Sequence, residues 1–367
     1  MVNDLPLFEA SPSLGKRLAY ASLGELPTPV ERLDMLAARV GAANLYIKRD
    51  DLSGVEYGGN KVRKLEFVLA RAQADHRGAV ITFGAVGSNH VLATAIYAQR
   101  LGLGCSGILH PQPITRGLTA NLLKARSANA RVYHCTSTQA RRMLTAREFL
   151  YWTLRTGRKP LVIPLGGSSP LGVMGFVNAA FELKAQINAA MLPEPDVLYV
   201  TLGTMGTAAG LALGLRLAGL KTRIEAIRVV APSVANEQSY RQLYGSAHAL
   251  IAGADPALAT EAAATGGNIE LRHDFFGRKY ALFTEEGMAA VRLMNETEGI
   301  NLDGTYTGKT LAALIADAKA GKLKGKTVLF WNTYNSRDLK TSTLADYHEL
   351  PQDFHSYFEN PPQPLDT

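Results

Sequence analysis

The chain has few cysteines and no long apolar run. Its 367 residues include only two cysteines, Cys105 and Cys135, too few for a disulfide framework or a four-cysteine zinc site. Apolar runs are broken by glycine or polar residues well before the roughly 20 residues that span a bilayer. The first residues lack the basic and apolar blocks of a secretory signal. We therefore expect a cytoplasmic protein with no membrane segment and no metal centre.

An excess of charge of one sign is also missing. There are 39 Lys and Arg against 32 Asp and Glu, a net charge of +7. Neither a basic stripe interleaved with aromatic residues nor zinc-finger spacing is present, so we expect no nucleic-acid binding. The densest basic stretch, residues 319–326, is interpreted as a solvated loop between a helix and a strand. A small anionic substrate or a phosphate-bearing cofactor is the alternative use of this charge.

Apolar residues make up 47 % of the chain, enough for a sizeable core, and the length favours two domains. Short β-branched runs alternate with helical patterns, which predicts an α/β fold with parallel sheets covered on both faces. The predicted strands are 44–48, 79–83, 105–109, 130–135, 161–164, 196–202, 224–230 and 327–331. The predicted helices are 61–74, 91–101, 137–156, 172–190, 207–218, 284–298 and 307–320. We expect the proline-rich tail from Pro351 to be loosely held.

Lys61 follows two glycines, Gly58 and Gly59, and opens a predicted helix. A lysine in the first turn faces the positive end of the helix dipole, so local stability does not explain it. A lysine that forms a Schiff base would explain it, because burial and nearby positive charge lower its pKa toward the working range. The alternative is an exposed lysine in a basic segment with Arg63 and Lys64.

A glycine-punctuated loop ending in Ser88-Asn89-His90 follows the strand predicted at 79–83. Ser88 and Asn89 can cap the next helix, and the free N–H groups at a helix start are a natural carboxylate site. Capping alone is the alternative, and His90 could equally be a structural histidine.

Two further junctions are rich in glycine and threonine. The stretch Gly203-Thr204-Met205-Gly206-Thr207 joins a buried strand to a helix of small residues, and backbone N–H groups with threonine hydroxyls there could cradle a phosphate. It is neither a Walker A loop nor a dinucleotide fingerprint, and tight packing is the alternative. The second junction carries Tyr306, which could move a proton or be structural.

Taken together, these segments resemble the fold-type II pyridoxal-phosphate enzymes related to tryptophan synthase β. The similarity is greatest to the D-cysteine desulfhydrase and 1-aminocyclopropane-1-carboxylate deaminase family, over about residues 20 to 340. The residues that carry it are Lys48-Arg49-Asp50-Asp51-Leu52, Gly58-Gly59-Asn60-Lys61-Val62-Arg63-Lys64-Leu65-Glu66, Gly87-Ser88-Asn89-His90 and Tyr306-Thr307-Gly308-Lys309.

The resemblance implies a role for each matching residue. Lys61, next to Asn60, would bind pyridoxal phosphate and later move the Cα proton. Asn89 would bond the ring oxygen of the cofactor, and Ser88 the substrate carboxylate, with His90 beside them. The remaining implied site residues are Gly203, Thr204, Met205, Gly206 and Thr207 around the phosphate, Thr333 or Thr307 near the pyridine nitrogen, and Tyr280, Tyr306 and Tyr334 around the substrate.

The resemblance also implies a two-domain, three-layer α/β/α fold. The larger, cofactor-binding domain would comprise residues 1–61 and 173–367, and a smaller α/β domain, residues 62–172, would be inserted in it. The active site would lie in the cleft between them, and the chain would form a homodimer.

Two positions favour α,β-elimination of a small amino acid over deamination of an aminocyclopropane carboxylate. The deaminase type has Tyr-Glu-Gly-Lys where this chain has Tyr306-Thr307-Gly308-Lys309, and Gln at His90. A carboxylate beside the pyridine nitrogen strengthens the electron sink that ring opening needs, whereas a threonine leaves it weaker. The deaminase, a sulfo-lyase, a biosynthetic lyase or cyclase, a racemase and a non-catalytic binding protein are the alternatives.

Three departures from the family pattern set this chain apart. Met205 and Gly304 stand where Gly and Pro are usual. Asn332-Thr333-Tyr334-Asn335 replaces His-Thr-Gly-Gly, so Tyr334 and Asn335 are expected to remodel the substrate pocket. The configuration of the substrate and its leaving group are not determined by the sequence.

Overall fold

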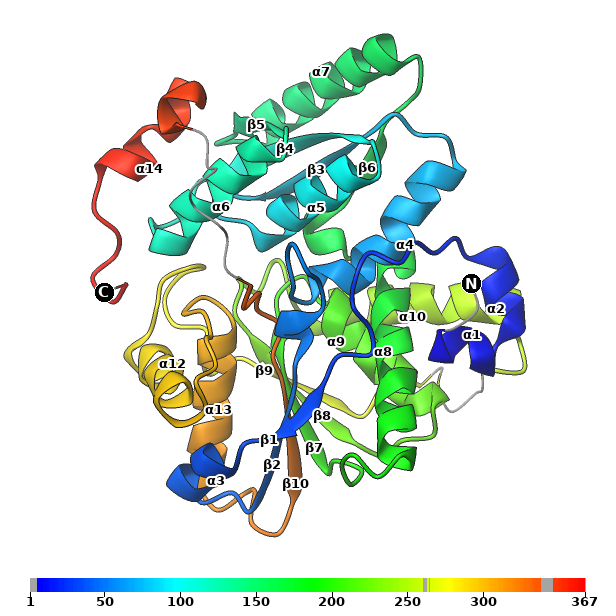
Figure 1. Ribbon diagram of the computed structural model, residues 1–367, viewed down its shortest axis with the longest axis vertical. Helices are drawn as coiled ribbons and strands as arrows, with labels where there is room; N and C mark the ends of the chain where they lie inside the picture. The colour runs from blue at the N-terminus through cyan, green and yellow to red at the C-terminus, as the bar shows by residue number, and fades with distance from the viewer. Residues whose placement is uncertain (1–4, 260–262, 264, 338–345, 367) are drawn as a thin grey trace.

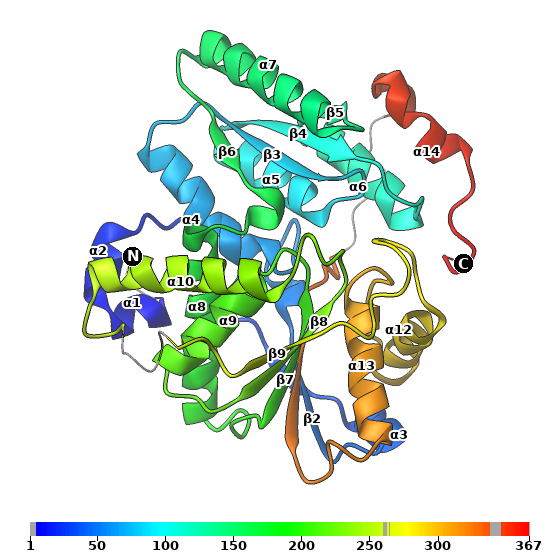
Figure 2. The same cartoon turned by 180° about the vertical axis from the view of Figure 1, so that it is seen from behind.

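The computed structural model describes residues 5–259, 263, 265–337 and 346–366, in which ten strands form two sheets, each with helices on both faces (Figures 1 and 2). The strands are β1 (Val30–Arg32), β2 (Asn44–Lys48), β3 (Ala79–Ala85), β4 (Gly104–His110), β5 (Arg131–His134), β6 (Leu161–Ile163), β7 (Val197–Leu202), β8 (Arg223–Arg228), β9 (Ile269–Arg272) and β10 (Thr327–Trp331). The longer helices are α3 (Asp34–Val40), α4 (Lys61–Ala74), α5 (Asn89–Arg100), α6 (Arg116–Ser127), α7 (Thr138–Thr156), α8 (Pro170–Asn188), α9 (Gly206–Leu217), α10 (Glu237–Ala254), α12 (Glu285–Glu298) and α13 (Thr307–Lys319). The shorter ones are α1 (Pro6–Ala10), α2 (Pro12–Arg17) and α14 (Ser356–Glu359), with 3-10 turns η1 (Asp50–Leu52), η2 (Leu165–Gly167), η4 (Tyr347–Glu349) and η5 (Gln352–Phe354).

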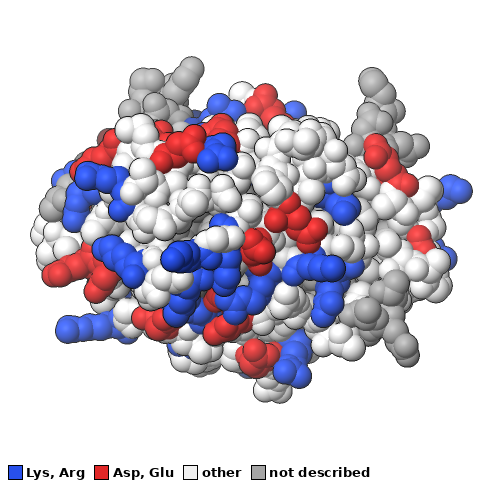
Figure 3. Space-filling model, turned by 90° about the horizontal axis from the view of Figure 1, so that it is seen from below, with Lys and Arg blue, Asp and Glu red and all other residues white. Residues whose placement is uncertain are grey.

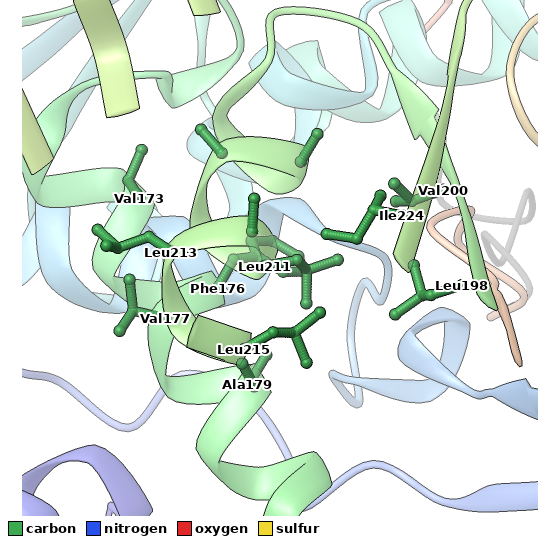
Figure 4. Close-up of a cluster of buried hydrophobic side chains, with 14 of the residues drawn as sticks. Val173, Phe176, Val177, Ala179, Leu198, Val200, Leu211, Leu213, Leu215 and Ile224 are labelled. Atoms are coloured by element: carbon green, nitrogen blue, oxygen red, sulfur yellow. The ribbon is translucent and has the colours of Figure 1, made fainter. Parts of the chain in front are cut away.

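The larger sheet has the order β1-β2-β10-β7-β8-β9 and is parallel except for β1. Side chains along β10 alternate between its two faces, as the period of two requires. Leu329 and Trp331 pack with the apolar residues of α8, α9 and α10, part of which Figure 4 shows. Val328 and Phe330 pack with α3, α12 and α13. Burial on both faces explains why these parallel strands are continuous apolar runs.

The smaller sheet has the order β5-β4-β3-β6, is entirely parallel, and comes from one continuous segment, residues 79–163. Helices α4, α5 and α6 cover one face, and α7 covers the other through Trp152. Helix α4 contacts both halves of the molecule, because Phe67 packs with the larger sheet and Leu65 with the smaller one. The domain limits at residues 61/62 and 172/173 stay a prediction.

The predicted three-layer α/β/α architecture is confirmed. All eight predicted strands and seven predicted helices are present, with ends within two residues of the predicted limits. Cys105 and Cys135 are buried and unpaired. The expectation of a loosely held tail is wrong, because Leu350, Phe354 and Tyr357 pack into the core of the smaller sheet.

The basic loop that precedes β10 lies at the end of the molecule opposite the smaller sheet. Lys319, Lys322 and Lys324 are exposed there, and Lys322 pairs with Asp317 at 2.9 Å. Figure 3 shows this face, on which Lys and Arg lie among Asp and Glu. The mixed signs fit a solvated surface. No helix among the described residues is long and apolar enough to span a membrane.

A buried network of charged residues joins α4 to the larger sheet and α8. The Arg63 guanidinium lies 2.7 Å from Asp50 and 2.9 Å from Glu182, and Lys48 lies 2.5 Å from Glu182. All four side chains are almost fully buried. Burial alone would raise the pKa of Glu182, but Arg63 and Lys48 lower it to about 2. Glu182 is therefore ionised, and its charge is matched by the buried basic groups beside it.

Replacing Arg63 by alanine removes the buried guanidinium that bonds to both Asp50 and Glu182, so Glu182 keeps Lys48 as its close cation and Asp50 keeps uncharged donors. We expect Arg63→Ala to lower the free energy of unfolding by about 3–5 kcal/mol, measured by urea denaturation. Arg71→Ala is the matched control on the same helix, because Arg71 makes an exposed pair with Asp75 that contributes roughly 0–1 kcal/mol. Equal losses in the two variants would contradict the role of the network.

Candidate active site

A cavity of about 270 Å³ lies between the two sheets, at the carboxyl ends of β3 and β7. It is lined by predicted site residues from both halves of the chain. These are Asn60, Lys61, Ser88, Asn89, His90, Gly203, Thr204, Met205, Gly206, Thr207, Tyr280, Tyr306, Thr333 and Tyr334. Loops at the carboxyl ends of parallel strands meet at one edge, which is why segments far apart in sequence converge here.

Lys61 is the first residue of α4, and its Nζ donates to Asn60 Oδ1 at 2.8 Å. Asn60 in turn donates to Thr207 Oγ1 at 2.9 Å, which connects the lysine to the start of α9. Burial lowers the pKa of Lys61 to about 8, with Asp303 acting in the opposite direction. A substantial fraction of the amine is therefore neutral, and nucleophilic, near pH 8.

Neither Arg63 nor Lys64 is exposed, so the alternative of a solvated basic segment is wrong. Arg63 has no exposed surface and Lys64 has 2 %. Lys64 lies one turn after Lys61 and lines the same cavity, where its Nζ donates to the Gly166 carbonyl at 3.2 Å. Burial and Lys61 lower the pKa of Lys64 well below its ordinary value. The i, i+3 spacing from Lys61 was the signal that could have predicted this residue in the site.

The start of α9 has the geometry of an anion cradle. Gly206 opens a twelve-residue helix, whose first N–H groups have no intrahelical partner. A Cβ at Gly206 would meet Lys64 Nζ at 2.8 Å and Ser168 Oγ at 2.7 Å, whereas one at Gly203 would meet no atom within 4 Å. The loop thus has open space at Gly203 and the buried Lys64 amine beside Gly206, and this amine can donate a hydrogen bond to a phosphate.

Met205 adopts a left-handed backbone conformation with φ of +66°. This region favours glycine, which explains why glycine is usual at this position of the family and why methionine is a departure.

Asn89 and His90 are fixed by bonds to neighbouring side chains. Asn89 Oδ1 accepts from the Tyr57 hydroxyl at 3.0 Å and from Asn121 at 2.8 Å, so its amide NH₂ is the group it can offer to a ligand. Ser88 caps α5. His90 Nε2 pairs with the Thr82 hydroxyl at 2.9 Å. Burial, with Lys61 and Lys64 adding to it, keeps the pKa of His90 well below its ordinary value, so the ring is neutral.

Two tyrosines face each other at the cavity. The hydroxyls of Tyr280 and Tyr306 are hydrogen-bonded, and their rings meet edge to face with centroids 6.1 Å apart. Burial raises the pKa of Tyr280 to about 12, and burial together with Tyr280 raises that of Tyr306 well above its ordinary value. Both phenols therefore keep their protons at neutral pH and can donate them.

Thr307 is the one predicted site residue that does not line the cavity. Its hydroxyl donates to Asp303 Oδ1 at 2.8 Å, so it is engaged at the start of α13. Thr333 is then the remaining candidate for the pyridine nitrogen. Asn335 also turns away from the cavity, because its Oδ1 accepts the Gly58 N–H at 2.7 Å. Of Tyr334 and Asn335, the two residues expected to remodel the pocket, only Tyr334 lines the cavity.

Three residues that line the cavity were not among the predicted site residues: Lys64, His110 and Asp303. Among the described lining residues Asp303 is the only carboxylate. Its oxygens accept the N–H groups of Thr305, Tyr306 and Thr307 at 3.0–3.1 Å. Asp303 therefore holds the residues that lead into α13, but it lies three residues before the N-cap, Tyr306, so its position is not an ordinary capping signal.

These features fit one class of protein. Lysine, anion cradle and amide around one cavity are the donor set that pyridoxal phosphate requires, and the sequence matches the family described as pyridoxal-phosphate dependent enzymes over residues 21–333. A solved structure of a 1-aminocyclopropane-1-carboxylate deaminase homologue is similar, with a TM-score of 0.74 and 30 % identity over 94 % of this chain and 98 % of that one. Serine racemase from Dictyostelium discoideum has the same fold, with a TM-score of 0.60, 16 % identity, and coverage of 91 % and 98 %.

Similar proteins of known name narrow this class to one enzyme family. A D-cysteine desulfhydrase of Salmonella choleraesuis is 39 % identical over 79 % of this chain and 85 % of its own length. One of Klebsiella pneumoniae is 38 % identical over 84 % and 91 %. A bifunctional D-cysteine desulfhydrase/1-aminocyclopropane-1-carboxylate deaminase of Arabidopsis thaliana is 35 % identical over 90 % and 82 %. The chain belongs to the D-cysteine desulfhydrase family and is a pyridoxal-phosphate-dependent lyase.

The lowered pKa of Lys61 makes cofactor uptake depend on pH. Because the neutral amine is the nucleophile, we expect covalent uptake of pyridoxal phosphate by the cofactor-free protein to accelerate as pH rises, with a midpoint near 8. Stopped-flow absorbance measures the rate. Pyridoxal without its phosphate is the control and should show the same midpoint, since the lysine and not the phosphate titrates. A midpoint above 10 would exclude a buried Lys61.

Proposed function

We propose that this chain catalyses α,β-elimination from a small amino acid with a β-leaving group such as a thiol. Substrate and water would give a keto acid, ammonia and the leaving group. The observation that carries the proposal is the buried Lys61 amine, which shares a cavity with a phosphate cradle and the Tyr280–Tyr306 pair. This arrangement supplies a base at Cα and an acid for the leaving group.

The substrate carboxylate and the cofactor each have partners in this proposal. Ser88 and the first N–H groups of α5 bind the carboxylate, since a helix start favours an anion. The chain of hydrogen bonds from Lys61 through Asn60 to Thr207 fixes the lysine relative to the phosphate cradle, where the Lys64 amine can donate a hydrogen bond to the phosphate. Asn89 offers its amide NH₂ to the ring oxygen of pyridoxal phosphate.

Pyridoxal phosphate, when bound, supplies the electron sink that stabilises negative charge at Cα. Lys61 accepts the Cα proton as its amine, because a pKa of about 8 suits a general base near neutral pH. The Tyr280–Tyr306 pair keeps its protons and donates one to the departing group.

Elimination is favoured over aminocyclopropane ring opening by the lack of a free carboxylate. Asp303, the carboxylate lining the cavity in the described part of the chain, is occupied by N–H groups at the start of α13. Thr333 is then the partner for the pyridine nitrogen, and its neutral hydroxyl leaves the electron sink weaker. A good leaving group requires less of the sink than ring opening does. Homodimer formation and a cytoplasmic location stay predictions.

A panel of D- and L-amino acids tests the proposed reaction. We expect keto acid and ammonia in equal amounts from cysteine or chloroalanine of one configuration, and much slower release from 1-aminocyclopropane-1-carboxylate. Coupled assays for both products provide the measurement, and chiral analysis of recovered substrate separates racemisation. Spectral shifts without any product, or faster ring opening than elimination, would contradict the proposed reaction.

Tyr334 is expected to limit the size of the leaving group. Tyr334→Gly removes a ring from the cavity wall, so kcat/KM for bulky S-substituted cysteines should rise about tenfold relative to cysteine. Tyr334→Phe is the matched control, because it keeps the ring and should leave the ratio unchanged. If the Phe variant changes the ratio as much as the Gly variant, the hydroxyl and not the volume sets the selectivity.

A further inference from the structure

The C-terminal segment, residues 346–366, lies against both halves of the molecule. It packs first on the half that contains the smaller sheet, where Phe354 has no exposed surface and the Tyr357 hydroxyl lies 3.3 Å from His134 Nε2. Figures 1 and 2 show the segment then running from α14 toward α12 of the other half. It lies outside the residues matched to the enzyme family, 21–333.

Gln363 is the residue of this segment that bonds to both halves. Its N–H donates to the Ile114 carbonyl at 3.0 Å, just before α6. Its side chain accepts the Phe283 N–H at 2.7 Å and donates to the Ala281 carbonyl at 2.8 Å. A carboxamide can accept from one backbone group and donate to another in this way without being charged.

The end of the segment is held as well. Asp366 accepts the N–H of Arg116, the first residue of α6, at 2.7 Å, where the positive end of the helix dipole favours a carboxylate. Gln363 therefore lies between two attachments to the smaller-sheet half, and its side chain makes hydrogen bonds to the other half.

The turn that Gln363 contacts carries a catalytic tyrosine and a strained residue. Ala281 is 1 % exposed and has φ of +62°, a conformation that persists only where the surroundings enforce it. Tyr280, its neighbour, bonds to Tyr306. Its ring meets that of His110, at the end of β4, edge to face with centroids 6.4 Å apart. A change in the turn would therefore move the Tyr280 hydroxyl.

We propose that Gln363 is a positioning residue: its side-chain amide fixes the 280–283 turn against the smaller-sheet half and so keeps Tyr280 bonded to Tyr306 at the cavity. This proposal rests on the proposed function in giving Tyr280 a part in the reaction. The bridge also joins the two walls of the cavity, so it sets how closely they approach around the substrate.

Gln363→Ala removes both side-chain bonds and leaves the backbone bond to Ile114. We expect kcat/KM for the eliminated amino acid to fall about tenfold, mainly through kcat, because a misplaced proton donor slows the chemical step. The absorbance of the lysine-bound cofactor should not change, and hydrogen exchange at the Phe283 amide should become faster. Gln363→Glu keeps the acceptor for the Phe283 N–H but loses the donor to the Ala281 carbonyl. Its kcat/KM should therefore lie between those of the wild type and Gln363→Ala. Gln352→Ala, an exposed glutamine of the same segment, should match the wild type.

A double-mutant cycle separates positioning from a general loss of structure. In a Tyr280→Phe background, Gln363→Ala should lower kcat/KM by less than about twofold further, because the Tyr280 hydroxyl that Gln363 positions is already absent. A full tenfold loss in that background would overturn the proposal, as would wild-type kinetics and exchange in Gln363→Ala. If the wild-type holoenzyme turns over none of the panel, the proposed function fails on its own. Hydrogen exchange at the Phe283 amide in Gln363→Ala then tests whether Gln363 holds the turn. Faster exchange would support that role, and unchanged exchange would overturn it.

Discussion

The buried guanidinium of Arg63 is the interaction on which the site depends. Two residues after Lys61, it bonds at once to Asp50, which follows β2, and to Glu182 of α8. Asp50 also accepts the Trp331 indole N–H at 2.8 Å, at the end of β10. A charge buried to this degree is costly unless every partner is in place. The network therefore admits one position of α4 relative to the larger sheet.

Desolvation gives the groups of the cavity their protonation states. The rigid start of α4 keeps Lys61 away from water, which lowers its pKa, while the same burial keeps Tyr280 and Tyr306 protonated. A neutral amine and two neutral phenols therefore line one cavity, which supplies the base and the acid of the proposed reaction at the same pH. Proton removal at Cα and protonation of the leaving group need this combination.

The sequence predicted the parts of the fold whose pattern is local. Strongly apolar parallel strands such as β7 and capped helices such as α5 carry their own signals. It missed β1, whose Val30-Glu31-Arg32 is short, polar and paired only at a sheet edge. It also missed α10, whose buried face is Tyr240, Tyr244, Ala247 and Ile251. That spacing is helical, but the tyrosines and the glycine at 245 weaken it as a pattern.

The site was predictable where a residue type is rare in its local context. Lys61 at a helix start and the Gly203–Thr207 loop are such cases. Lys64 and Asn335 were not predicted correctly, because their environments are set by contacts distant in sequence: Lys64 with Gly166, and Asn335 with Gly58. The C-terminal tail was predicted wrongly for the same reason. The prolines near its end suggested mobility, but Phe354 and Tyr357 are buried in the core of the smaller sheet. Tertiary contacts override local composition at all of these positions.

Borohydride reduction of the holoenzyme followed by peptide mapping tests the central claim most directly. Reduction fixes the cofactor to the amine that holds it, and mass spectrometry identifies that residue. Lys61 and Lys64 lie three residues apart in one cavity, so fragment ions distinguish them. The account predicts the label on Lys61 alone. A label on Lys64 or on a lysine outside the cavity, or no label in a protein that retains its visible absorbance, would contradict it.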